Sequence, residues 1–327
     1  MLIDEGLESN DSGSFLVKFG RRDVDNLCNK QRKESKELLI LKALDKRMLL
    51  KEKDKRHFLH LKKGYDGEKR FDEVTESLLN DCYILNDLLL PANGTVIQLD
   101  AVIITSEQIY LFEIKNYEGN YYYEKDRFYT IHHKEIANPL NQLRRSETIL
   151  RQLLLGLGWN NPMSSAVVFI NPEFTLYQAP ITLPFIFPTQ INRHFAKIKT
   201  TSRTLTERHR LLAEKLISLH IEDSPFIQLP NYEYSQLKKG MICKKCSGFS
   251  LTLDGKLAIC QQCGIQESVE QAIIRSVTEF TLLFPERKIT TKGMEEWCSH
   301  PISYKRIKRI LEKYYRYVPS NRWSYFE

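Results

Sequence analysis

Two predicted strands of this 327-residue chain carry acidic and basic side chains among apolar ones. The segment 96–104 contains Asp100, and the segment 109–116 contains Glu113 and Lys115. Because side chains alternate across a strand, Glu113 and Lys115 share one face, as Asp100 does with Gln98. A short turn pairs the two segments and brings the three charged groups together. Buried charges are costly unless they are paired or bind a metal, so this arrangement needs a salt bridge or a cation.

Phosphodiester hydrolysis is the chemistry that uses two carboxylates and a lysine in this way. Mg²⁺ prefers oxygen ligands, and Asp100, Glu113 and the carbonyl of Ile114 could hold one or two such ions. The metal lowers the pKa of a bound water and stabilises charge in the transition state. Lys115 would orient the water or neutralise developing charge, and Glu68 could add a carboxylate through a water. The alternative is a structural ion pair, since Glu-x-Lys occurs three times in the chain.

A second group of chemically active residues consists of cysteines. Two Cys-x-x-Cys pairs are separated by thirteen residues, namely Cys243, Cys246, Cys260 and Cys263. Two such pairs can bring four thiolates to one tetrahedral Zn²⁺, and Asp254-Gly255 between them is a good hairpin turn. We therefore predict a structural zinc ribbon that folds only with its metal. Three further cysteines lack partners at metal-ligand spacing, namely Cys28, Cys82 and Cys298.

The C-terminal segment 304–316 is strongly basic, with six basic residues against one acidic residue. Its apolar residues follow helical spacing, and a shorter predicted helix at 291–299 precedes it, which indicates helix-turn-helix geometry. A basic second helix of this kind could lie in the major groove of DNA. The predicted nucleic-acid contacts are Lys305, Arg306, Arg309, Lys313 and Arg316. The alternative is a small helical bundle with an ordinary charged face.

Periodicity divides the rest of the chain into helices and strands. Segment 30–63 carries thirteen basic residues against five acidic ones, and the pattern from about residue 31 predicts one long basic amphipathic helix or two shorter ones. Glycines at 64 and 67 predict an end to it before a new helix over 68–79. Strands and a helix over 138–156 then predict a mixed α/β unit. The predicted domains are an N-terminal arm with a basic helix (1–60), the α/β domain (61–175), an extension of that core (176–237), the zinc ribbon (238–267) and a C-terminal helical domain (268–327).

Composition excludes several classes of protein. The chain has 48 basic and 41 acidic residues, a formal charge of +7 and 42% hydrophobic residues, which excludes a collagen-like or wholly disordered chain. No apolar run reaches 18 residues, so we predict no membrane span. No glycine-rich phosphate loop is present, so we predict no nucleotide cofactor. Nothing marks the chain for export, and the expected location is the cytoplasm.

Asp-x(12)-Glu-x-Lys on consecutive strands resembles the pattern of the PD-(D/E)xK nuclease superfamily. More narrowly, several segments of the chain resemble the NERD, or nuclease-related, domain. These segments are Gly64–Glu68, Gln98–Asp100, Phe112–Asn116 with Gly119 beyond it, Asn138-Pro139 followed by Gln142 and Arg145, and Val167–Pro172. The resemblance runs from about Lys63 to Pro172, roughly a third of the chain.

The resemblance implies a restriction-endonuclease-like mixed sheet flanked by helices, and a role in DNA processing with Mg²⁺ or Mn²⁺. Residue by residue, it implies a site made of Glu68, Asp100, Glu113, Lys115, Gln98 and Gln142. The alternative for Gln142 is a helix-start residue that satisfies backbone groups. We expect a metal-dependent nuclease that acts on DNA rather than RNA. Two other hypotheses are a non-catalytic nucleic-acid-binding adaptor and a module that recruits another protein.

Overall fold

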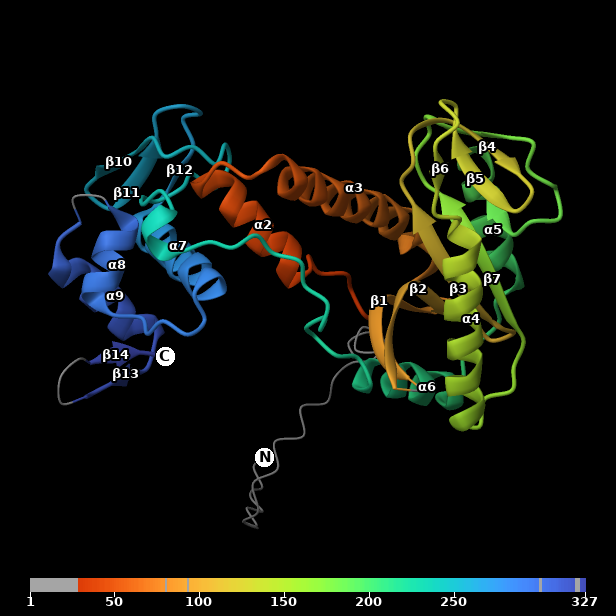
Figure 1. Cartoon of the computed structure of the whole chain (residues 1–327). Coiled ribbons are helices and arrows are strands. Elements are labelled where there is room, and N and C mark those ends of the chain that lie inside the picture. Colours follow the sequence, from red (N-terminus) through yellow and green to blue (C-terminus); the bar gives the residue numbers. More distant parts are fainter. Residues whose placement is uncertain (1–28, 80, 93, 300–301, 321–323) are drawn as a thin grey trace, which may run out of the picture. The chain divides into compact units, whose positions relative to one another are not determined.

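The chain forms two compact units, and each is built from two separate stretches of sequence (Figure 1). The computed structural model describes residues 29–79, 81–92, 94–299, 302–320 and 324–327. Unit 1 comprises residues 29–32 and 70–221, and unit 2 comprises residues 33–69 and 222–327. The predicted arm over 1–28, with Cys28, lies outside the described residues. The domain boundaries predicted from the sequence stay predictions.

Unit 1 is built on a five-stranded mixed sheet in the order β1-β2-β3-β7-β9. Its strands are β1 (Tyr83–Ala92), β2 (Thr95–Ile104), β3 (Ile109–Lys115), β7 (Met163–Phe169) and β9 (Phe185–Ile186). The first three pair antiparallel, whereas β3, β7 and β9 run parallel. The alternation and the short turns of 82–116 predict the antiparallel meander, and the helix between β3 and β7 is the crossover that a parallel pair requires. The predicted mixed α/β fold is thus confirmed.

Helices cover both faces of this sheet. On one face, α4 (Pro139–Gly156) and α6 (Glu207–Ser218) pack into an apolar cluster with the strands, and the amphipathic stripe of α4 supplies four of its buried leucines. On the other face lie α5 (Ile191–Thr201) and Phe71, which is fully buried. The remaining short helices of unit 1 are η1 (Glu76–Leu78) and η2 (Pro188–Gln190). The sheet is therefore buried on both sides, as a sheet with parallel strands usually is.

A second, four-stranded sheet adjoins the α4 side of unit 1. Its order is β6-β5-β4-β8, from β4 (Gly119–Glu124), β5 (Arg127–Thr130), β6 (Glu135–Ile136) and β8 (Phe174–Tyr177). Aromatic rings join the two sheets: Phe169 of β7 stacks on Phe174 with centroids 4.0 Å apart, and Phe128 stacks on Phe169 at 6.0 Å. Such ring pairs add to the free energy of burying their surface.

Unit 2 combines two N-terminal helices with the C-terminal third of the chain. Its elements are α2 (Lys36–Arg47), α3 (Glu52–Thr75) as far as Lys69, η3 (Tyr234–Gln236), β10 (Leu251–Asp254), β11 (Leu257–Cys260), β12 (Gln266–Ser268), α7 (Val269–Leu283), α8 (Thr291–Cys298), α9 (Tyr304–Tyr314), β13 (Tyr317–Val318) and β14 (Tyr325–Phe326). One apolar cluster contains side chains of α2, of the cysteine segment and of α7 to α9. These parts of unit 2 thus share a single core.

A buried arginine joins three parts of unit 2. The Arg47 guanidinium donates to the carbonyl of Lys238 at 2.6 Å and pairs with the Glu279 carboxylate at 2.5 Å. It also lies over the Trp297 ring, 4.0 Å from the centroid. A buried charge is tolerated when it is paired and hydrogen-bonded in this way, and breaking such a pair is strongly destabilising.

The glycines at 64 and 67 do not end a helix, contrary to our prediction. The basic segment forms two helices, one of the two predicted outcomes, but the second of them, α3, continues through Gly64 and Gly67 to Thr75. A glycine within a helix costs only about 1 kcal/mol relative to alanine, so helical neighbours on both sides can override it. The boundary between the two units falls inside α3.

Candidate functional site

The two predicted acidic residues of β2 and β3 lie at the point where these strands stop pairing. The last pair of the β2–β3 ladder before this point is Ala101 with Phe112, which puts Asp100 and Glu113 next in register. Their side chains are almost fully buried, at 6% and 2% exposure. The Ile114 backbone N–H donates to Asp100 Oδ2 at 2.8 Å, across the gap between the strands. Both carboxylates therefore belong to one small, buried region of unit 1.

Lys115 links this pair of strands to helix α4. Its Nζ donates to Glu113 Oε1 at 2.6 Å and to Gln142 Oε1 at 3.1 Å. Gln142 follows the first turn of α4, whose N-cap Asn138 accepts from the N–H of Leu140. The structure thus brings together four of the six residues predicted for the site, with Gln142 turned toward the lysine.

The charges of the site shift its pKa values in opposing ways. Burial raises the pKa of Asp100, although Lys115, the Ile114 N–H and Arg32 each act to lower it. Burial alone would lower the pKa of Lys115, but the carboxylates of Glu113 and Asp100 outweigh this and raise it. Lys115 is therefore a cation at neutral pH. Asp100, by contrast, is held in surroundings that disfavour its negative charge, which a nearby cation would relieve.

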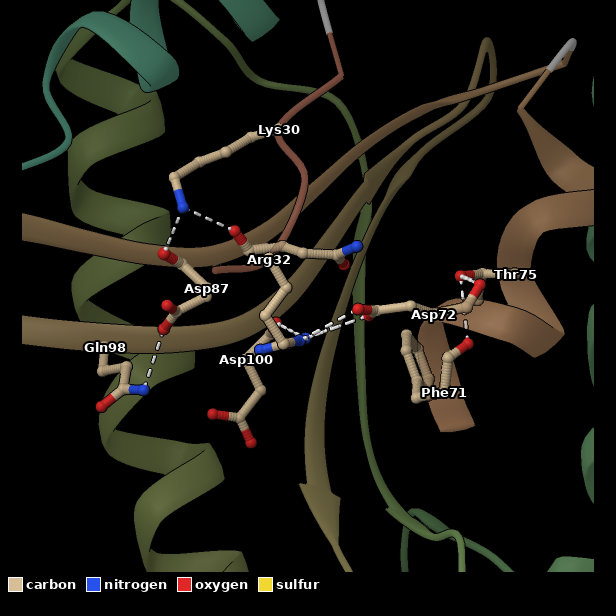
Figure 2. Close-up of polar contacts among 9 residues, drawn as sticks. Lys30, Arg32, Phe71, Asp72, Thr75, Asp87, Gln98 and Asp100 are labelled. Carbon is tan, nitrogen blue, oxygen red and sulfur yellow. Dashed lines mark hydrogen bonds and ion pairs between the residues drawn. The ribbon is translucent and has the colours of Figure 1, made fainter. Parts of the chain in front are cut away.

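Gln98 is exposed and bonds Asp87, an acidic residue of β1. Its amide Nε2 donates to Asp87 Oδ1 at 3.0 Å, as Figure 2 shows. Asp87 lies between the ladder pairs Asn86–Ala101 and Leu88–Leu99, has a left-handed backbone with φ of 53°, and raises the pKa of Asp100 by its charge. A left-handed aspartate is uncommon and locally alters the course of a strand. Sequence reasoning missed Asp87 because it sits within an apolar run.

A buried arginine supports the backbone of Asp100 (Figure 2). Arg32, whose side chain is 1% exposed, donates through Nη2 to the Asp100 carbonyl at 2.7 Å. The same guanidinium pairs with Asp72 at 3.3 Å. Lys30 bonds the carbonyls of Asn86 at 2.9 Å and Asp87 at 2.8 Å. Sequence reasoning missed these residues, because 68 positions separate Arg32 from Asp100.

Glu68, the remaining predicted acidic residue, lies on α3 and is half-buried. It belongs to unit 2, whereas Asp100 and Glu113 belong to unit 1. Its predicted role as a ligand through a water therefore stays a prediction.

The donor set of unit 1 suits a hard divalent cation. Asp100 and Glu113 offer carboxylate oxygens at the point where β2 and β3 stop pairing, and carboxylate oxygens are ligands that Mg²⁺ prefers. Within the part of unit 1 that the structure describes, no third His, Cys, Asp or Glu ligand atom joins these two within 4.8 Å. Water and backbone oxygens would have to complete the coordination, as is common for Mg²⁺.

The four paired cysteines gather in unit 2, and their ligand atoms all lie within 4.8 Å of one another. Cys243 Sγ is 3.6 Å from Cys263 Sγ, and Cys246 Sγ is 3.5 Å from Cys260 Sγ. A tetrahedral Zn²⁺ with Zn–S bonds of about 2.3 Å needs sulfurs about 3.8 Å apart, so this cluster fits zinc.

The backbone around these cysteines forms two tight turns. In the first, the Ser247 N–H bonds the Cys243 carbonyl at 3.0 Å, and in the second the Gly264 N–H bonds the Cys260 carbonyl at 2.9 Å. Gly264 has φ of 70°, a left-handed value that glycine adopts without strain. Strands β10 and β11 join at the predicted Asp-Gly turn. Cys82 and Cys298 are buried free thiols outside this cluster.

The five predicted nucleic-acid contacts on and after α9 fall into two groups. Lys305 and Arg309 are exposed. The other three bond groups of unit 2: Arg306 donates to the Gly255 carbonyl at 2.8 Å, Lys313 pairs with Glu270 at 2.7 Å, and Arg316 pairs with Glu327.

The mixed α/β fold of unit 1 is consistent with a nuclease-like fold. Residues 63–170 match the family model of NERD, the nuclease-related domain. This agrees with the resemblance drawn from the sequence over nearly the same residues. No curated protein matches the chain, and no solved structure matches it either. No helix among the described residues has both the length and the apolar character needed to span a bilayer.

Proposed function

We propose that the protein is a divalent-metal-dependent nuclease that hydrolyses phosphodiester bonds in DNA. The observation that carries this proposal is the buried group of Asp100, Glu113 and Lys115, with Gln142 of α4 bonded to the lysine, inside a stretch that matches the nuclease-related domain. A structural ion pair between Lys115 and Glu113 accounts for two of the three charged groups, and it leaves Asp100 buried with a hydrogen bond from the Ile114 N–H to one carboxylate oxygen.

In this proposal, Asp100 and Glu113 hold the cation. When bound, a divalent ion lowers the pKa of a coordinated water and offsets negative charge on the phosphoryl group. Asp100 would have to be ionised to serve as a ligand, and Lys115 and Arg32 favour its ionised form against the effect of burial.

Lys115 serves as a fixed positive charge rather than as a base. The raised pKa of its ammonium keeps it protonated at neutral pH. Its bonds to Glu113 and Gln142 hold Nζ in one place, so that it can neutralise the charge that develops on the non-bridging phosphate oxygens. Gln142 thereby orients the lysine and need not contact the substrate.

The test is cleavage of labelled single- and double-stranded DNA and RNA with Mg²⁺ or Mn²⁺. We expect DNA cleavage that falls on the order of 10²-fold or more in Asp100→Ala and in Lys115→Ala. Two exposed residues of unit 1 provide matched controls, Glu173→Ala and Lys134→Ala, which should cleave like the parent protein.

Other outcomes favour other functions. Nucleic-acid binding without cleavage, unchanged in both site variants, would favour the adaptor. If neither binding nor cleavage occurs at low salt, where phosphate contacts are strongest, recruitment of another protein becomes the better hypothesis.

A further inference from the structure

The last 59 residues of unit 2, from α7 onward, have the topology of a winged helix. Helix α7 is followed by Ile289, helices α8 and α9, and then the antiparallel pair β13–β14. Ile289 forms an antiparallel bridge with Phe326, and Phe326 also pairs with Tyr317. The order is thus helix, single-residue bridge, helix, helix, strand, strand, and Phe326 of the last strand lies between its two pairing partners, Ile289 and Tyr317. In DNA-binding domains built on a helix-turn-helix, the second helix of the pair is the one that enters the groove.

Helix α9 occupies that position and has two distinct faces. Ser303 caps it by accepting from the N–H of Arg306. Ile307, Ile310 and Leu311 are buried against the core of unit 2. The opposite face carries the exposed Lys305 and Arg309 and the half-buried Lys308, which pairs with Glu312 of the same helix at 3.6 Å; the helix has five basic residues against one acidic residue. The packing of α9 therefore presents a positive surface without any loss of apolar burial.

Some basic side chains of α9 bond other elements of unit 2, and these differ from the basic side chains that face outward. The Arg306 guanidinium donates to the Gly255 carbonyl, in the turn of the zinc-ribbon hairpin. Lys313 pairs with Glu270 at the start of α7. The exposed side chain of Lys256, next to Gly255, extends the positive surface of α9 onto the hairpin. Arg306 and Lys313 thus hold α9 against other elements of unit 2.

We propose that α9 is the recognition helix of a duplex-DNA-binding site, with Lys305, Lys308 and Arg309 facing the DNA, Lys256 of the hairpin beside them and β13–β14 as the wing. The duplex is DNA because an α-helix about 10–12 Å wide fits the B-form major groove, which is about 12 Å wide. The major groove of A-form RNA is too narrow for side chains to read. This site lies in unit 2 and is independent of the cleavage chemistry proposed for unit 1.

The test measures binding without added divalent cations, so that cleavage plays no part. Fluorescence anisotropy of the full chain with a labelled duplex of about two helical turns gives the affinity at several salt concentrations. Each phosphate contact contributes about 0.9 to the slope of log K against log salt. We expect the slope of Lys305→Gln/Arg309→Gln to be smaller than that of the parent by about 1.8. Duplex RNA of the same sequence should bind more weakly than DNA.

Matched variants make the result specific. Lys53→Gln/Lys62→Gln removes the same charge from exposed positions of α3 in unit 2 and should leave the slope unchanged. Arg306→Gln should also keep the parent slope, because its guanidinium already bonds Gly255. Far-UV circular dichroism checks that each variant is folded.

Three results would overturn the proposal. The first is no binding of duplex DNA at low salt. The second is an equal loss of slope in the α3 control, which would mean diffuse attraction to a basic protein. The third is equal binding of duplex RNA and DNA, which would exclude a helix in the major groove. A failure of the cleavage assay leaves each of these results readable, since they are obtained without catalysis.

Discussion

Removal of the metal from the cysteine cluster should unfold unit 2 as a whole, and not the cysteine segment alone. Cys243 and Cys260 are each 1% exposed and belong to the same apolar cluster as α2 and the helices α7 to α9. If the cluster holds Zn²⁺, Cys263→Ser removes one ligand and a strong chelator removes the metal. The four sulfurs then lose what holds them within 4.8 Å of one another.

The energies are large relative to the stability of a domain. Structural zinc contributes about 10–16 kcal/mol in zinc-finger peptides, whereas domains are stable by about 5–15 kcal/mol in total. If the hairpin merely detached, unit 2 would lose the burial of Leu251, about 1.5–3 kcal/mol, and the bond from Arg306 to Gly255, about 0.5–1.5 kcal/mol. Even this minimum of roughly 2–4.5 kcal/mol is a large share of such a stability.

Hydrogen exchange followed by mass spectrometry on the full chain measures this loss segment by segment. We expect peptides from α2, α7 and α9 to lose protection together, while peptides from β1 to β3 in unit 1 keep theirs. Cys298→Ser is the control, because it removes a buried thiol of the same core that lies outside the cluster. It should retain one zinc per chain and the protection of α2.

The opposite result is equally clear. If exchange increased only within 243–263, and α2 stayed protected, the cysteine segment would be an appended module, as its sequence suggests. The shared core would then be too weak to couple the segment to the rest of unit 2.

Three further predictions concern unit 1. Asp100→Asn should abolish cleavage yet raise the melting temperature at neutral pH, because the folded protein disfavours the ionised carboxylate. The raised pKa of Asp100 stabilises the fold at a pH below the pKa of this group in the unfolded chain, and this contribution is lost as the pH rises. The gain of the variant in thermal melts should therefore shrink toward pH 4. Arg32→Met should cost about 3–5 kcal/mol in urea unfolding, since it leaves Asp72 without this partner, and a cost near zero would show that the pair is dispensable. Phe71→Ala should cost about 3–5 kcal/mol, because this fully buried ring leaves a cavity; a change below 1 kcal/mol would mean that the site collapses around it.

The paired strands and the lysine could be predicted because their signals are local. Two alternating segments with a short turn can pair in few ways, and a spacing of two residues puts Glu113 and Lys115 on one face. The stripe of leucines in α4 was equally direct evidence for a helix. The position of Gln142 beside Lys115 could come only from the resemblance, since no pattern in 138–156 points to the sheet.

Other features depend on contacts that no local pattern encodes. Leu99 and Val102 belong to the same apolar cluster, although strict alternation would put them on opposite faces of β2. The switch occurs around Asp100, and the left-handed Asp87 lies in the same part of the β1–β2 ladder. Arg32 lies two residues after Lys30, where the described part of this segment forms a bridge with Leu85 of β1. Tertiary packing fixes these features, so the residues that support Asp100 could not be found from spacing.

The discontinuous order of the two units has a consequence for synthesis on the ribosome. The 152 residues from 70 to 221 separate the two stretches of unit 2. At about 5–20 residues per second, translation needs on the order of 10–30 s to cross this interval. During that time the residues of unit 2 that bury Leu38, Leu41 and Leu44 of α2 in the folded protein have not yet been synthesised. Nascent or prematurely ended chains therefore expose the apolar face of α2, which a chaperone would have to cover. Unit 1, by contrast, can fold as soon as its last helix has been synthesised.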